Sequence, residues 1–177
     1  MKIEDDFLAQ ENFDELQTLM VSNVFPWFYN DVVDFIDEED KFQFVHLFYD
    51  NYVPTSNIQL INPLLIKIDA TALWRIKANL LTITPNIIEN TFHQDMGLGY
   101  RDGVESAGPP EKQVLLKQVT TSIFYVNTNN GYTKFEDGTK VESVANRFVT
   151  FSTNNKHSGS TCTDQKRRVV INFNYFK

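Results

Sequence analysis

Cysteine is almost absent from this sequence of 177 residues, which contains only Cys162. A single cysteine can form no intrachain disulfide and no cysteine-based zinc site. Long apolar runs are also missing, so no segment reaches membrane-spanning length, and the acidic start, MKIEDDF, lacks the apolar region of a secretory signal. We therefore expect a soluble protein of the reducing cytoplasm that makes no contact with a membrane.

Basic residues are outnumbered, because 16 lysines and arginines face 23 aspartates and glutamates, which gives a formal net charge of −7. Attraction to nucleic acid or to an anionic membrane requires clustered cations. The charge balance therefore disfavours a nucleic-acid partner, although it leaves room for a local basic pocket. The short run Lys166, Arg167 and Arg168 is a candidate for such a pocket, either as a phosphate-binding patch or as the source of an arginine that binds a carboxylate.

Hydrophobic residues, in contrast, make up 42% of the chain, and there are 15 phenylalanines. This length and composition predict one globular domain with a sizeable core. Apolar residues at helical spacing predict helices at about 11–21 and 56–68. Runs of β-branched and aromatic residues between turn signals predict an antiparallel sandwich or barrel. Its strands are expected at 42–49, 73–81, 114–127, 132–136, 140–144, 147–152 and 168–175.

The last of these strands has one polar and one apolar face, because side chains alternate along a strand. One face carries Arg168, Val170, Asn172 and Asn174, and the other carries Val169, Ile171, Phe173 and Tyr175. A cation and two amides on one face indicate a sheet that is lined inside with polar groups. The strand at 73–81 also has a polar face, formed by Arg75, Lys77 and Asn79. Exposure of this face to solvent explains its polarity at least as well as contact with a ligand.

Three residues form a candidate metal site. His93 and Asp95 are two positions apart, so in extended backbone their side chains point the same way. Together with His157 they make a set of two imidazoles and one carboxylate. Such a set occupies one face of an octahedron and leaves three positions open, as expected for non-haem Fe(II) that binds a cosubstrate and O₂. The remaining histidine, His46, lies among apolar neighbours and is expected to be a hydrogen-bonded core residue.

Arg168 is the candidate partner for a cosubstrate of the metal. A keto acid that chelated the metal would bring a second carboxylate into the pocket, and this charge would require a buried cation, preferably a bidentate one. Arg168 lies 11 residues after His157, on the polar face of its strand. Arg167 points to the opposite face and is therefore assigned to the outside.

The stretch 96–113 is rich in glycine and proline and follows the candidate ligands directly. Gly97-Leu98-Gly99 lacks the strand, glycine spacing and helix of a phosphate-binding loop, so that interpretation is weak. The stretch is either a lid that contacts substrate or an ordinary surface insertion, and the sequence does not separate the two.

The order His93-X-Asp95, His157, Arg168 resembles that of the 2-oxoglutarate- and Fe(II)-dependent dioxygenases, in particular their prolyl 4-hydroxylase-like branch. The resemblance covers about residues 73–176. It implies a mainly β fold with N-terminal helices (α+β), built on a double-stranded β-helix or jelly roll. Residues 73–177 would form the jelly-roll core, and residues 1–72 would support it within the same domain.

Two more stretches carry this resemblance. Residues 123–127, IFYVN, look like the Tyr-Leu-Asn strand of the branch, which implies that Tyr125 hydrogen-bonds the 2-oxoglutarate carboxylate. Residues 131–135, GYTKF, look like its Gly-Gly-X-Leu-X-Phe hairpin, although Tyr132 and Thr133 replace two residues that are often apolar.

Two positions near the end of the chain complete the comparison. Asn172 falls where relatives often carry a small polar residue near the cosubstrate. The spacing from His157 to Arg168 is slightly longer than in many relatives, which leaves Arg167 open as an alternative anchor. The C-terminal half also looks like short oxygenases of marine tailed phages, which would place the protein in a host cytoplasm.

The resemblance implies an enzyme that uses Fe(II), 2-oxoglutarate and O₂, and it leaves ascorbate as a further candidate. Oxidative decarboxylation of 2-oxoglutarate to succinate and CO₂ would accompany hydroxylation of a substrate C–H bond. A peptide or protein substrate, with proline as the hydroxylated residue, is expected by branch resemblance, and a small molecule stays open. The alternatives are a nucleobase-modifying oxygenase and a non-catalytic jelly-roll binding or structural module. The oligomeric state is not indicated.

Overall fold

The computed structural model describes residues 1–33, 41–50, 52–95, 100–101, 104–105 and 118–177. Its helical elements are α1 (Gln10–Met20), the 3₁₀ helix η1 (Ile58–Ile61) and α2 (Asn62–Ile68). The first strands are β1 (Lys2–Glu4), β2 (Phe28–Asn30), β3 (Gln43–Asp50), β4 (Val53–Pro54), β5 (Ala72–Thr82), β6 (Tyr100–Arg101) and β7 (Val104–Glu105). The later strands are β8 (Val119–Tyr125), β9 (Tyr132–Phe135), β10 (Lys140–Glu142), β11 (Arg147–Ser152), β12 (His157–Gly159) and β13 (Arg167–Phe176).

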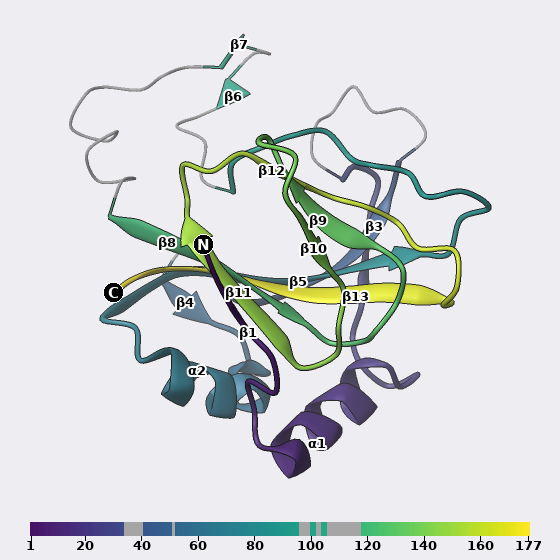
Figure 1. Ribbon diagram of the computed structural model, residues 1–177. Coiled ribbons are helices and arrows are strands. Elements are labelled where there is room, and N and C mark those ends of the chain that lie inside the picture. The colour runs from purple at the N-terminus through teal and green to yellow at the C-terminus, as the bar shows by residue number, and fades with distance from the viewer. Residues whose placement is uncertain (34–40, 51, 96–99, 102–103, 106–117) are drawn as a thin grey trace.

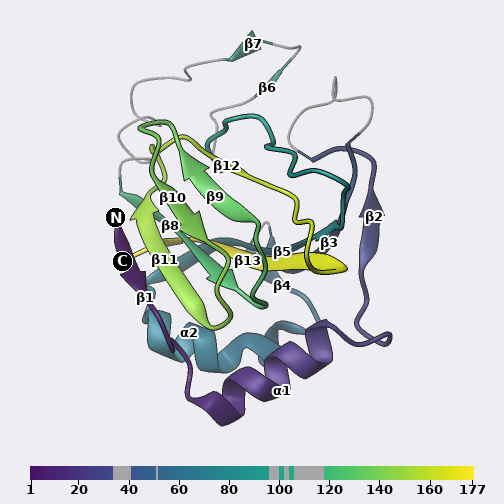
Figure 2. The same cartoon turned by 45° about the vertical axis from the view of Figure 1, so that its right-hand side comes forward.

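An eight-stranded antiparallel sheet forms the centre of the molecule. Its order is β1-β11-β8-β13-β5-β3-β2, and β4 pairs with β3 at its side. Helices α1 and α2 cover one face of this sheet, and the smaller sheet of β9, β10 and β12 lies over the other (Figures 1 and 2). The strands near the N-terminus, β1 to β3, pair into the same large sheet as the strands of the C-terminal half.

The smaller sheet has the order β10-β9-β12. The segment 88–95 runs beside β12 and is joined to it by two isolated bridges, Glu89 with Ser160 and His93 with His157. Two antiparallel sheets packed face to face make a jelly roll, so the expected mainly β fold with supporting helices is confirmed. Strands β6 and β7 form a separate two-stranded ladder.

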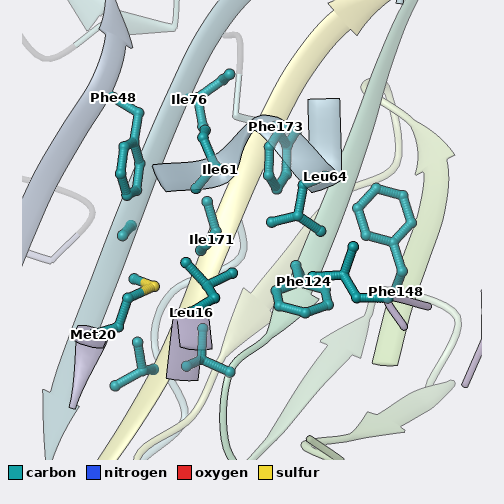
Figure 3. Close-up of a cluster of buried hydrophobic side chains, with 14 of the residues drawn as sticks. Leu16, Met20, Phe48, Ile61, Leu64, Ile76, Phe124, Phe148, Ile171 and Phe173 are labelled. Carbon is teal, nitrogen blue, oxygen red and sulfur yellow. The ribbon is translucent and has the colours of Figure 1, made fainter. Parts of the chain in front are cut away.

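The main hydrophobic core lies between the large sheet and the helices (Figure 3). Helix α1 contributes Phe13, Leu16 and Met20, whose spacing places them on one side of the helix. Figure 3 shows Leu16 beside Ile171 of β13, while Ile76 of β5 lies near Ile61. Burial of these apolar side chains, each worth about 1.5–3 kcal/mol, holds the helices to the sheet.

A second, smaller core lies between the two sheets. It includes Ile123, Tyr125 and Val170 of the large sheet together with Phe135 and Val141 of the small one. The alternation predicted for the last strand is therefore confirmed. Along β13, Val169, Ile171, Phe173 and Tyr175 face the helical core, while Arg168, Val170 and Asn172 line a cavity on the other side.

The continuous helix predicted for 56–68 is wrong, because the structure divides it into η1 and α2. Pro63 lies in the first turn of α2, where its missing N–H group costs nothing. In the interior of a longer helix its ring would clash with the carbonyl of Gln59. The preceding residues therefore form a 3₁₀ turn, and α2 ends at Asp69 in the left-handed conformation, with φ 51°.

Strand β5 alternates as predicted from Arg75 to Leu81, but the pattern breaks before Arg75. A bulge shifts the register with β13, so that Arg75 pairs with Asn174 whereas Leu73 pairs with Tyr175. The extra residue at this bulge turns Leu73 to the helical core, while Arg75 stays on the opposite face near Asp95. A bulge of this kind re-aims side chains, and bulges are frequent beside functional sites.

The helix at 11–21 and the other strand predictions correspond to elements of the described chain. The strand expected from residue 114 begins at Val119 in β8, and residues 114–117 lie outside the described residues. The predicted lid or insertion at 96–113 lies outside them too, except for the four residues of β6 and β7. Among the helices of the described chain, none is long and apolar enough to cross a membrane.

Candidate active site

The two candidate histidines lie opposite each other on neighbouring extended segments. The His93 backbone N–H donates to the His157 carbonyl at 2.9 Å, and the His157 N–H donates back to the His93 carbonyl at 3.0 Å. Residues paired in this way across an antiparallel ladder direct their side chains to the same side of the sheet. The imidazole rings accordingly lie 4.9 Å apart. Backbone pairing between distant segments, 64 residues apart in sequence, therefore brings them together.

Asp95 completes the group from the same face. Its Oδ1 lies 3.8 Å from His93 Nε2 and 3.9 Å from His157 Nε2. One ligand atom from each residue lies within 4.8 Å of the other two, a spacing that can hold one metal ion. The donors, two imidazole nitrogens and one carboxylate oxygen, suit Fe(II) and leave coordination positions open.

Hydrogen bonds set the orientation of both rings. His93 Nδ1 lies 3.1 Å from the Thr91 carbonyl, and His157 Nδ1 lies 3.2 Å from the Asn155 carbonyl. A carbonyl can only accept, so each Nδ1 carries the proton in these contacts. In the neutral ring this places the lone pair on Nε2, the atom that would bind a metal.

Asp95 is an ionised carboxylate inside the protein. Its side chain is only 3% exposed, and burial by itself would raise its pKa. The charges of His157, Arg75 and His93 and a hydrogen bond from Asn174 outweigh burial and hold the pKa of Asp95 below its usual value. Because the carboxylate is charged at neutral pH, it is ready to bind a cation.

Arg168 forms a second polar centre in the same region. Its guanidinium is 3% exposed; Nε donates to Ser143 Oγ at 2.8 Å and Nη2 donates to Thr133 Oγ1 at 3.2 Å. Burial lowers the pKa of Arg168, although a guanidinium stays charged at neutral pH. Within the described residues no carboxylate pairs with it. A buried cation without a counter-ion indicates a site for an anion.

Tyr125 reaches this centre through Thr133. The Tyr125 hydroxyl donates to Thr133 Oγ1 at 2.8 Å, and the Arg168 guanidinium carbon lies 5.7 Å from the centre of the Tyr125 ring. Burial raises the pKa of Tyr125, so its hydroxyl stays protonated at neutral pH. Thr133 lines the cavity, whereas Tyr125 lies behind it. The expected bond from Tyr125 to the cosubstrate carboxylate stays a prediction.

One cavity connects the metal-binding residues with the arginine. Its lining includes the candidate metal ligands His93, Asp95 and His157 and also Thr133 and Arg168 of the second polar centre. A small molecule that chelated a metal with one end could therefore place its other end near the guanidinium. This single cavity is the structural link between the two halves of the predicted site.

Further polar residues line the wall of this cavity. Asn172 is among them, as expected, and so are Lys77 and Asn79 of β5 and Gln43 of β3. Two of the three polar residues predicted on one face of β5, Lys77 and Asn79, thus line the cavity, and their contact with a ligand stays a prediction. Within the described chain, Oδ1 of Asn172 and Oδ1 of Asn79 are buried without a hydrogen-bond partner. Each oxygen could therefore accept a hydrogen bond from a ligand in the cavity.

Arg167 and His46 lie away from the cavity, as the sequence predicted. Arg167 Nη1 donates to the Val21 carbonyl at the end of α1, on the opposite side of β13 from Arg168. His46 is 3% exposed, and its Nδ1 lies 2.9 Å from the Pro26 carbonyl, as in a hydrogen-bonded core histidine.

Sequence reasoning missed several supporting residues. Asn127 donates to the Arg167 carbonyl and accepts from the Val169 N–H, both at 2.9 Å, so its amide fixes the backbone on both sides of Arg168. Its place in the Tyr-Val-Asn run was the available signal. Ser143 lies 25 residues from Arg168 in the chain, and no local pattern connects the two.

Comparison with known proteins supports the fold assignment. No protein-family model matches the chain, and no curated protein matches it. Many solved structures do. A prolyl hydroxylase from Trichoplax adhaerens, in complex with a peptide of the oxygen degradation domain of hypoxia inducible factor, has a TM-score of 0.65 and 14% identity. That match covers 99% of this chain and 82% of that one.

Two further solved structures are similar to this chain. The viral collagen prolyl hydroxylase of Paramecium Bursaria Chlorella virus-1, in complex with 2-oxoglutarate, has a TM-score of 0.59 and 13% identity over 99% of this chain and 95% of that one. A 2OG-Fe(II) oxygenase family oxidoreductase from Burkholderia pseudomallei has a TM-score of 0.61 and 11% identity over 97% and 81% of the two chains.

These matches support the jelly-roll fold. Prolyl hydroxylases are prominent among the similar structures, so the predicted resemblance to a prolyl 4-hydroxylase-like fold is confirmed. At sequence identities of 11–14%, the structural similarity establishes the fold but not the reaction. The reaction is therefore argued from the site.

Proposed function

We propose that this protein is an Fe(II)- and 2-oxoglutarate-dependent dioxygenase that hydroxylates a substrate C–H bond. The observation that carries the proposal is the single cavity lined both by His93, Asp95 and His157 and by the buried guanidinium of Arg168. A site for a metal alone would require only the first group. A chelating dicarboxylate explains why an arginine without a carboxylate partner lies in the same cavity.

His93 Nε2, Asp95 Oδ1 and His157 Nε2 would hold the metal, and Arg168 would bind the far carboxylate of 2-oxoglutarate. With Fe(II) bound there, the site would consume 2-oxoglutarate, O₂ and a substrate C–H bond and would release succinate, CO₂ and the hydroxylated product. The protein residues would orient the cosubstrate and neutralise the negative charge of its far carboxylate. Thr133, with Tyr125 behind it, would add a hydroxyl to that carboxylate subsite, and Asn172 would contact the cosubstrate from β13.

For the substrate, we propose a peptidyl residue, with proline as the first candidate. The support is the prolyl hydroxylase-like fold, and the Trichoplax structure was solved in complex with a peptide. The acidic net charge of −7 favours a peptide over a nucleic acid. A phage source belongs to the same proposal and rests on the sequence resemblance, and a cytoplasmic location rests on the near-absence of cysteine.

The proposal is tested by 2-oxoglutarate turnover. Purified protein with Fe(II), 2-oxoglutarate and ascorbate is expected to form succinate slowly without substrate and faster with a peptide that it accepts. Mass spectrometry of peptide libraries should then detect the gain of one oxygen atom. His157→Ala is expected to abolish both signals, because it removes one of three ligands.

The matched control is His46→Ala. This variant removes a buried histidine that contacts the Pro26 carbonyl and lies outside the cavity, so it should lose stability but keep succinate formation in its folded fraction. Succinate formation at the wild-type rate in His157→Ala would refute the metal assignment. Absence of turnover, metal binding and 2-oxoglutarate binding in folded wild-type protein would instead leave a non-catalytic jelly-roll module.

A further inference from the structure

The two oxygens of the Asp95 carboxylate have different partners. Oδ1 faces the two imidazoles, 3.8 Å from His93 Nε2 and 3.9 Å from His157 Nε2. Oδ2 accepts a hydrogen bond from Asn174 Nδ2 at 3.1 Å. One oxygen is therefore directed at the candidate metal position, and the other is held by the wall of the large sheet.

Asn174 is itself fixed in place. It is fully buried on β13, and its Nδ2 also lies 3.1 Å from Thr121 Oγ1 on the neighbouring strand β8. Thr121 in turn lies 2.8 Å from Thr153 Oγ1. Because a carboxylate only accepts, the NH₂ side of the amide must face Asp95. Both N–H groups of Asn174 thus have partners, and its orientation is determined.

Arg75 supports Asp95 from the other side. The bulge in β5 pairs Arg75 directly with Asn174. The Arg75 guanidinium donates to the Asp95 backbone carbonyl at 3.1 Å and lies 3.7 Å from Oδ1. A row of polar side chains across β8, β13 and β5 therefore supports Asp95, with hydrogen bonds to its backbone carbonyl and to Oδ2 and an ion pair with Oδ1.

The hydrogen bond from Asn174 to Oδ2 fixes which oxygen of Asp95 faces the two imidazoles. A residue that holds a metal ligand in its binding orientation supports metal affinity through that ligand. We propose that Asn174 is a positioning residue that keeps Asp95 Oδ1 directed at the metal position, an inference that rests on the proposed function.

The test is a double-mutant cycle on metal affinity. Co(II), an Fe(II) substitute that is stable in air, is titrated by calorimetry into wild-type protein, Asn174→Ala, Asp95→Ala and the double variant. Loss of a residue that supports a metal ligand typically costs about 10–100-fold in affinity. We expect at least a tenfold loss for Asn174→Ala in the wild-type background and no further loss in the Asp95→Ala background, because Asn174 acts through Asp95.

Two further variants separate positioning from folding. Thr121→Val removes the second acceptor of Asn174 at nearly constant volume, and it should weaken Co(II) binding in the same direction by a smaller factor. Ser122→Ala is the matched control. Its hydroxyl is equally buried but bonds Thr150 and Tyr175 on the opposite face of β8, so it should lower the unfolding temperature without changing Co(II) affinity.

The possible outcomes separate the positioning role of Asn174 from the proposed metal site. A loss for Asn174→Ala that depends on the presence of Asp95 supports the inference. An equal loss in both backgrounds, or no loss in either, overturns it while leaving the proposed function intact, provided that Asp95→Ala itself weakens binding. Unchanged Co(II) affinity in Asp95→Ala would overturn the proposed metal site and the inference together.

Discussion

Neighbouring arginines on β13 have opposite environments, although they have the same side chain. Arg168 points into the cavity and contacts Ser143 and Thr133, whereas Arg167 contacts the end of α1. The alternation of a strand was sufficient to predict this difference from the sequence.

Replacement of each arginine by alanine tests the anchor. Arg168→Ala is expected to raise the KM for 2-oxoglutarate by at least about tenfold, because a hydrogen bond to a charged group is worth about 1.5–3 kcal/mol. Arg167→Ala should leave that KM unchanged. Steady-state succinate formation at varied 2-oxoglutarate measures both, and the reverse pattern would mean that the anchor is misassigned.

Gly131 gives a second prediction for a single residue. A Cβ at this position would lie 2.7 Å from Arg168 Cδ, 2.7 Å from the Thr161 carbonyl oxygen and 2.8 Å from Asn129 Oδ1. Backbone cannot move easily, so Gly131→Ala should displace Arg168, lower the free energy of unfolding by about 1–3 kcal/mol and raise the KM for 2-oxoglutarate.

Gly138→Ala serves as the comparison for Gly131→Ala. Gly138 has a φ of +88°, but nothing lies within 4 Å of its added Cβ. This variant should lose stability through backbone strain, of about 1–3 kcal/mol, and keep its KM. An unchanged KM in Gly131→Ala, measured by the same succinate assay, would contradict the packing argument.

Pairing of two separate segments, 88–95 and β12, assembles the metal-binding residues. The sequence predicted the chemistry of these residues, because His-X-Asp and a distant histidine are recognisable by type and spacing. It did not predict that His93 and His157 form a directly opposed backbone pair, because no local pattern encodes which strands become neighbours. The bulge in β5 was not predicted either, because it depends on the register between β5 and β13.

Asn127 links the end of β8 to β13, and its loss tests how that contact supports the site. Asn127→Ala removes two hydrogen bonds to the backbone on both sides of Arg168. Two such bonds are worth about 1–3 kcal/mol together, and their loss should also raise the KM for 2-oxoglutarate. Asn130→Ala removes an exposed amide that makes two hydrogen bonds to Thr163. It lies away from Arg168 and should leave the KM unchanged, so an equal rise in KM for the two variants would contradict the assignment.

The whole molecule separates its stabilising core from its candidate chemistry. The helices cover one face of the large sheet, and the smaller sheet lies over the other (Figure 2). The main apolar cluster lies on the helical side, while the residues that line the polar cavity belong to the opposite face and to the smaller sheet. Composition predicted a core of this size, and strand periodicity predicted the two faces. The way the helices cover only one face follows from tertiary packing, which periodicity alone does not determine.

Ligand binding should therefore stabilise the complete fold. A ligand at a hundred times its dissociation constant adds about 2.7 kcal/mol to the free energy of unfolding. Co(II) with 2-oxoglutarate is expected to raise the Tm of the wild-type protein, measured by differential scanning calorimetry, and to leave the Tm of Asp95→Ala nearly unchanged. An equal rise in both would indicate that the metal binds elsewhere.

The central claim is that three side chains from two distant segments share one ferrous ion with 2-oxoglutarate, whose far end reaches Arg168. The most direct measurement is an anaerobic titration of Fe(II)-loaded protein with 2-oxoglutarate, followed by visible absorption. The account predicts a weak charge-transfer band in the wild type that is absent in His157→Ala and requires more 2-oxoglutarate in Arg168→Ala. A folded, iron-loaded wild-type protein without this band, or an unchanged band in His157→Ala, would contradict it.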